Sequence, residues 1–63
     1  MRINRIKLVA AMAQLDLNGK QLAEKAGVSR GTVTAVRTGK SCSAETAEKL
    51  ASVLGYDIIE ERS

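Results

Sequence analysis

The sequence predicts an all-α domain of four to five short helices. A chain of 63 residues gives room for a single domain, residues 1–63. It contains no proline, so no position is barred from a helix interior. Hydrophobic residues make up 44% of the chain and aromatic residues only 2%. The thin core of so small a domain must therefore be built from aliphatic side chains.

The first helix is expected to begin after Asn4, a residue type that caps helix N-termini well. Four apolar residues then follow with the spacing i, i+3, i+4 and i+7 of one helical face: Ile6, Val9, Ala10 and Ala13. This period predicts an amphipathic helix with that face toward the core.

The second helix is predicted over residues 19–26. Asn18 precedes it as N-cap, and Gln21 three residues later completes a capping-box pattern. Gly27 follows, and glycine readily adopts the left-handed conformation that ends helices. Caps at both ends therefore define this helix.

The third helix is predicted over residues 30–38. Ser29 is its N-cap, and Gly39 ends it as Gly27 ends the second helix. Val33 and Val36 lie on one side of it. That side is expected to pack on the rest of the domain.

A fourth helix is predicted after Ser43, with Glu45 in its first turn, where a negative charge complements the helix dipole. Gly55 ends it. Its expected inner face consists of Ala47, Leu50, Ala51 and Leu54. The following tail, residues 56–63, fits either a short helix or an extended segment. Its apolar residues fit either a cap on the core or part of a dimer contact: Tyr56, Ile58 and Ile59.

The charges are unevenly distributed along the chain, whose net charge is +3. Residues 1–40 carry eight Lys or Arg and two acidic residues, a net charge of +6. Residues 41–63 carry two Lys or Arg and five acidic residues, a net charge of −3. This asymmetry suits a protein that presents one face to a nucleic acid, although +3 is also ordinary solubilising charge.

Composition argues against several function classes. The chain has no His and a single Cys, which rules out an internal disulfide and leaves a zinc site short of ligands. Glu45 and Glu48 have the spacing of a solvated helix surface, and the chain has no glycine-rich nucleotide loop. We therefore expect no enzyme, no catalytic residue, no metal, no cofactor and no small-molecule ligand.

The expected location is the cytoplasm. No apolar run is long enough for a signal peptide or a membrane span. The lone Cys42 is interpreted as an ordinary free thiol of a reducing compartment. A redox sensor, the other interpretation, would need a lowered thiol pKa.

The link between the second and third helices carries the functional prediction. It consists only of Gly27, Val28 and Ser29. So tight a link makes two short helices cross steeply, and the small Ala23 suits the point where they touch. Such a crossing leaves the far side of the third helix exposed, and an α-helix fits the major groove of B-DNA.

The combined pattern resembles the Cro and phage-repressor type of helix-turn-helix, the Xre family. The resemblance runs in register from about Ile6 to Ile59. It is carried by residues 17–29, by Thr32 and Val33, by residues 36–40 and by residues 47–54. It implies a lambda-repressor-like fold, binding of double-stranded DNA, usually as a homodimer, and regulation of transcription.

The resemblance also implies roles for individual residues. The base-contacting positions are Arg30, Gly31, Thr34 and Ala35. The phosphate-contacting positions are Gly19, Arg37, Thr38, Lys40, Ser41 and Ser43. Two alternatives stay open: Arg30 as a phosphate contact or solvated charge, and Lys40 as a complement to the helix dipole.

Two positions depart from the family pattern. Gly19 stands where Gln commonly binds phosphate, so only its backbone N–H is available. Met12 and Arg37 stand where several phage repressors have an Arg–Glu ion pair. Without that pair, Arg37 is free to face DNA.

The sequence thus predicts a sequence-specific DNA-binding regulator, most simply a repressor, of phage, mobile-element or bacterial type. A dimer would read a palindrome with half-sites about 34 Å apart. The alternative is a protein-interaction module or the antitoxin of a toxin–antitoxin pair. A DNA-binding protein keeps the third helix exposed and basic, whereas the alternative predicts an exposed apolar patch around residues 56–59.

Overall fold

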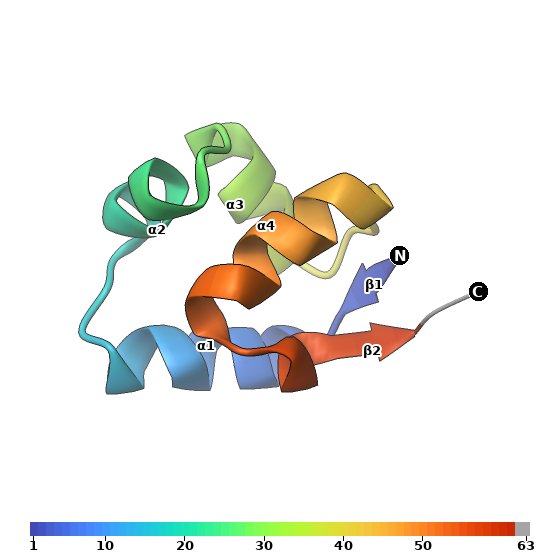
Figure 1. The fold of residues 1–63 in the computed structure, drawn as a ribbon, viewed down its shortest axis with the longest axis horizontal. Coiled ribbons are helices and arrows are strands. Elements are labelled where there is room, and N and C mark those ends of the chain that lie inside the picture. The colour runs from blue at the N-terminus through green and yellow to red at the C-terminus, as the bar shows by residue number, and fades with distance from the viewer. Residues whose placement is uncertain (62–63) are drawn as a thin grey trace.

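A computed structural model describes residues 1–61, which form four α-helices and a small ribbon that joins the two ends of the chain (Figure 1). The helices are α1 (Arg5–Gln14), α2 (Gly19–Ala26), α3 (Arg30–Arg37) and α4 (Ala44–Leu54). A single 3₁₀ turn, η1 (Tyr56–Ile58), follows α4. The predicted all-α class is therefore confirmed, and α3 ends one residue before the predicted limit, with Thr38 as its C-cap.

The ribbon pairs β1 (Arg2–Ile3) with β2 (Ile59–Glu61) in antiparallel orientation. The backbone N–H of Asn4 donates to the carbonyl of Ile58 at 2.7 Å, which continues the pairing. Met1, just before β1, is bonded to the α3–α4 link. Its ammonium donates to the Cys42 carbonyl at 2.7 Å, and the Cys42 N–H donates to the Met1 carbonyl at 2.8 Å. The first residues thus connect the tail with the α3–α4 link. The tail contains both of its predicted forms, first the 3₁₀ turn and then strand β2. Arg62 and Ser63 lie outside the described residues.

The predicted helix caps are present. The Asn4 side chain accepts hydrogen bonds from the N–H groups of Ile6 and Lys7, both at 3.0 Å. Asn18 and Gln21 form the capping box, with distances of 2.8 and 3.0 Å. The same role falls to Ser29 on α3 and to Ser43 on α4. Each such cap stabilises its helix by about 1 kcal/mol.

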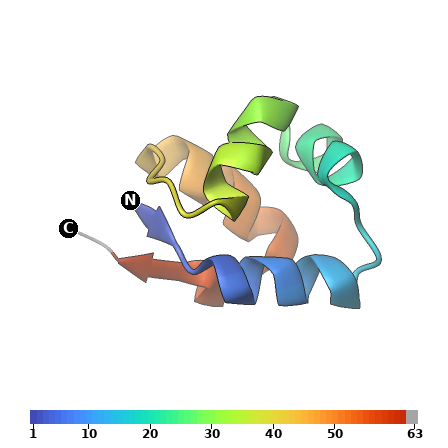
Figure 2. The same ribbon diagram turned by 180° about the vertical axis from the view of Figure 1, so that it is seen from behind.

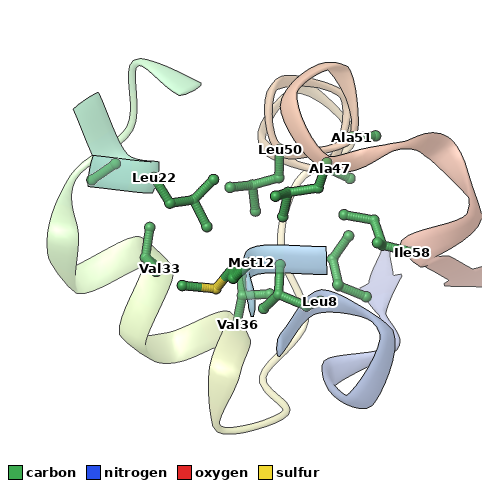
Figure 3. Close-up of a cluster of buried hydrophobic side chains, with 12 residues drawn as sticks. Leu8, Met12, Leu22, Val33, Val36, Ala47, Leu50, Ala51 and Ile58 are labelled. Carbon is green, nitrogen blue, oxygen red and sulfur yellow. The ribbon is translucent and has the colours of Figure 1, made fainter. Parts of the chain in front are cut away.

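The core lies between the four helices and η1, and every buried side chain among the described residues is apolar (Figure 3). The largest fully buried side chains come from all parts of the chain: Leu8, Leu22, Val33, Val36, Leu50 and Ile58. The predicted inner face of α4 is buried as expected, and so are both valines of α3. Ile58 is fully buried, so the tail caps the core, which was one of the two interpretations of its apolar residues.

The predicted inner face of α1 was wrong. Leu8 and Met12 are buried, whereas Ile6 is 75% exposed and Val9 45% exposed. Ala10 and Ala13 are also exposed. Helix α1 carries apolar residues on two opposite faces, so the period alone cannot choose between them. The fold buries the face with the longer side chains, Leu8 and Met12, because these remove more apolar area from water.

Candidate nucleic-acid interface

Helices α2 and α3 are joined by a turn that begins in the left-handed conformation. Gly27 has φ 73° and ψ 33°, and its N–H donates to the carbonyl of Ala23 at 2.9 Å. The N–H of Val28 reaches the same carbonyl at 3.0 Å. Because Ala23 is small and buried, the two helices approach closely there. The predicted geometry of the turn is therefore present.

The outer side of α3 faces solvent. Val33 and Val36 are buried, and the residues between and around them are exposed: Arg30, Gly31, Thr34 and Arg37. Ala35 is half-buried, so it offers less surface than the other predicted base-contacting residues. In Figure 2, α3 lies on the near side of the molecule with no other element in front of it. A helix exposed along one side in this way can enter the major groove of B-DNA.

Arg37 lies beside the first residue of α2. A Cβ atom placed on Gly19 would be 3.7 Å from a terminal guanidinium nitrogen of Arg37. The side chain of Arg37 therefore occupies the space in front of Gly19, where the family commonly has a glutamine. The two departures from the family pattern are thus neighbours in space, and the sequence alone gave no signal of this.

A shallow depression connects the start of α2 with the exposed side of α3. Its lining residues come from the start of α2 and the outer side of α3: Asn18, Gly19, Lys20, Arg30, Thr34 and Arg37. We call this set the α2–α3 corner. Three of its side chains are cationic, and the free N–H groups of the first turn of α2 add a partial positive charge. Such an arrangement suits a phosphate group. Lys20 was not among the predicted site residues.

The other predicted phosphate contacts lie on the α3–α4 link. Lys40 and Ser41 are exposed there. Two neighbouring hydroxyls are already used as donors: Thr38 Oγ1 donates to the Ala35 carbonyl at 2.8 Å, and Ser43 Oγ to Thr46 Oγ1 at 3.0 Å. A phosphate oxygen needs a donor. Lys40 and Ser41 are therefore better suited to this role than Thr38 and Ser43.

Additional basic residues near this surface come from the N-terminal segment. Arg5 lines one shallow depression with Arg37, and another with Arg2 and Gly39. Sequence reasoning missed them because they belong to no motif. Their only signal was the excess of basic residues in the first forty positions.

Cys42 is half-buried in the α3–α4 link. Burial raises the pKa of its thiol above the ordinary value, and the nearby N-terminal ammonium opposes this effect. A redox sensor requires the opposite shift. The geometry therefore agrees with an ordinary free thiol.

A short α2, a three-residue turn with a left-handed glycine and a solvent-facing α3 define a helix-turn-helix DNA-binding domain. The profile of the helix-turn-helix family matches residues 8–60, so the chain belongs to this family, in its Cro/C1 type. This family consists of DNA-binding domains and is not typically enzymatic. No curated protein and no solved structure gives a significant match. None of the described helices has the length and apolar composition needed to cross a bilayer.

Proposed function

We propose that this protein is a sequence-specific regulator of transcription that binds double-stranded DNA as a homodimer. The family resemblance favours a repressor of phage, mobile-element or bacterial type, which would act on DNA in the cytoplasm. The observation that carries the proposal is the α2–α3 corner, where Lys20, Arg30 and Arg37 surround the start of α2 beside an exposed α3.

In this proposal α3 lies in the major groove and Arg30 contacts a base edge. An Arg side chain binds guanine O6 and N7 in a bidentate manner. Thr34, one helical turn further on the same face, offers a hydroxyl and a methyl group to the next base. Gly31 has no side chain and lets the backbone approach closely. Ala35 adds at most a methyl contact, so specificity rests on few side chains.

Phosphate contacts at the start of α2 and on the link after α3 fix the register on the duplex. At the start of α2, Arg37 supplies a positive charge where the family commonly has the neutral amide of a glutamine, while Gly19 offers its backbone N–H. On the α3–α4 link, Lys40 and Ser41 add further contacts to the DNA backbone. This division explains how a chain without the usual glutamine retains a phosphate site at α2.

The first test is fluorescence anisotropy with two labelled duplexes, the DNA upstream of the protein's own gene and an unrelated duplex, at two salt concentrations. Tighter, salt-sensitive binding to the upstream duplex is expected. Equal weak binding to both would reduce the function to nonspecific electrostatic affinity. No binding to either at low salt would refute DNA binding.

The role of Arg37 has its own test. Arg37→Ala should weaken binding to all duplexes and reduce the slope of log affinity against log salt by about one. In the double variant Arg37→Ala/Gly19→Gln, the glutamine takes over the phosphate, so affinity should partly recover while the reduced salt slope persists. Gly19→Gln alone should not improve binding, because Arg37 already occupies that space. An unchanged salt slope in Arg37→Ala would contradict the assignment.

A protein-interaction module or antitoxin is the second candidate. It predicted an apolar patch around residues 56–59, but Ile58 is fully buried and Ile59 is half-buried, so only Tyr56 is a large exposed apolar side chain there. The basic, exposed α3 supports DNA binding instead. Two further large exposed apolar side chains, Ile6 and Val9, lie side by side on α1, outside the recognition helix α3.

A further inference from the structure

The outer face of α1 is an apolar surface that the fold leaves uncovered. It consists of Ile6, Val9, Ala10 and Ala13, all exposed, and we call it the α1 outer face. A surface helix ordinarily turns polar residues to solvent, and a helix that is apolar on all sides is ordinarily buried on all sides. Contiguous exposed apolar residues mark interaction surfaces. Among the described residues, Arg37 of α3 borders this face, yet all four of its side chains remain exposed. Helix α1 lies along the lower edge of the molecule in Figure 2.

We propose that the α1 outer face pairs with the same face of a second copy of this chain, with the two α1 helices antiparallel about a two-fold axis near Val9 and Ala10. This assigns the interface of the homodimer in the proposed function. The two claims fail independently, because dimerisation and DNA binding are measured separately.

The side chains of the face fit such a pairing. With the axis between positions 9 and 10, each Ile6 lies opposite Ala13 of the second copy, and each Val9 lies opposite Ala10. Every larger side chain therefore meets a small one, which is the arrangement that fills a helix–helix interface without voids or clashes. Alanines at the centre also allow the helix axes to approach to about 8 Å.

The charges at the two ends of the face are complementary in the same orientation. Arg5 and Arg37 of α3 line a depression with Ile6, Val9 and Ala10 at the start of α1, and Asp16 lines one with Ala13 at its end. In the antiparallel pair, Asp16 of one copy lies opposite position 3 of the other. It is therefore about two residues, roughly 3 Å along the helix axis, from Arg5 of that copy. It also sets each helix N-terminus beside a C-terminus of opposite partial charge. A parallel pairing would place like charges together.

The arrangement is also compatible with DNA binding. A two-fold axis perpendicular to α1, along the viewing direction of Figure 2, keeps both α3 helices on the same side of the dimer. Helix α1 contacts α3 directly. With about 10 Å from each α3 axis to its α1 axis and about 8 Å between the two α1 axes, the steps from one α3 to the other span up to about 28 Å. This is shorter than the roughly 34 Å between half-sites on successive turns, so the duplex must bend toward the dimer for both α3 helices to enter the groove.

The test compares the full chain with Ile6→Asp and with Ser52→Asp by sedimentation velocity over a range of concentrations. Ser52 is an exposed position on α4, so its variant adds the same charge away from the α1 outer face. Ile6→Asp should raise the dimer dissociation constant by about tenfold or more, because it would bury a carboxylate in an apolar contact. Ser52→Asp should dimerise like the parent. Thermal melting must first show that both variants are folded.

A cysteine variant tests the two-fold geometry. In a Cys42→Ser background, Ala10→Cys should form a disulfide-linked dimer under mild oxidation, because the two copies of position 10 lie at the axis. Ser52→Cys in the same background should not. A monomeric parent at every concentration and on a palindromic duplex, or a dimer that Ile6→Asp leaves intact, would overturn the proposal.

DNA binding separates this proposal from the proposed function. Ile6→Asn adds no charge beside Arg37, with which Ile6 shares a depression, so it should keep its affinity for an isolated half-site and lose the cooperative binding of two copies to a palindrome. If the parent dimerises through α1 yet binds no DNA, the interface stands and the proposed function fails. If the parent binds DNA and Ile6→Asn binds the palindrome with unchanged cooperativity, the interface fails and the proposed function stands.

Discussion

The outward faces of α3 and α1 contrast more sharply than any other two regions of this molecule. Helix α3 buries two valines and turns arginines and a threonine to solvent. Helix α1 buries Leu8 and Met12 and turns Ile6 and Val9 to solvent. A polar outer face forms hydrogen bonds with water and, when basic, can bind a polyanion. An apolar outer face in water is unfavourable in free energy and commonly marks an interaction surface. The two helices therefore indicate two different partners, DNA for α3 and a protein surface for α1.

The largest expected effect compares the two faces of α1 itself. Leu8→Ala should lower the free energy of unfolding by about 2–5 kcal/mol, since it removes a fully buried side chain from the core. Val9→Ala, one residue away on the outer face, should change the stability of the monomer by less than about 0.5 kcal/mol. Urea denaturation at low protein concentration measures both. Similar losses in the two variants would mean that the fold buries both faces.

The next effect concerns the outer face of α3. Arg30→Ala should reduce discrimination at one or two base pairs by about 1–3 kcal/mol, because a bidentate contact to guanine is lost. Binding to a set of single-base variants of the operator measures this. Lys49→Ala removes an exposed cation on α4 instead, so it is the matched control and should leave the base preference as it is. An unchanged preference in Arg30→Ala would assign Arg30 to phosphate binding or to solvent.

The smallest effect concerns Lys40 on the link that follows α3. Lys40→Ala should weaken binding to all duplexes alike and reduce the salt slope by about one. Its free energy of unfolding, measured by urea denaturation, should fall by no more than the roughly 0.3–1 kcal/mol that a C-terminal charge contributes through the helix dipole. A loss of stability without a change in salt slope would favour the dipole role over the phosphate contact.

Much of the α2–turn–α3 unit was predictable from the sequence because its determinants are local. The Asn18–Gln21 capping box, the left-handed Gly27 and the Ser29 cap each act within four residues of the chain. The spacing of Val33 and Val36 likewise defines one buried side of α3. Local hydrogen bonds and a clear hydrophobic period leave few alternative structures for this segment, so the order of residue types is enough to predict it.

The candidate site was predictable only in part. The exposed positions of α3 follow from its period, but the contact between Gly19 and Arg37 joins residues from two helices whose relative placement no spacing rule supplies. The same holds for Arg5 beside Arg37. Conversely, Thr38 and Ser43 were predicted as phosphate contacts by position, and only their hydrogen bonds show that their hydroxyl donors are already occupied.

The sequence by itself determined the helix ends, the turn and the polar character of α3, because each depends on interactions between near neighbours. The tertiary structure decided which face of α1 is buried and how the tail pairs with the first residues. Those outcomes depend on contacts between segments more than forty residues apart, such as the bond from Asn4 to Ile58 and the burial of Leu8 in a core shared with α4. A helix with two apolar faces has no local preference between them. The rest of the molecule selects the face that fills its core, and the other face remains on the surface.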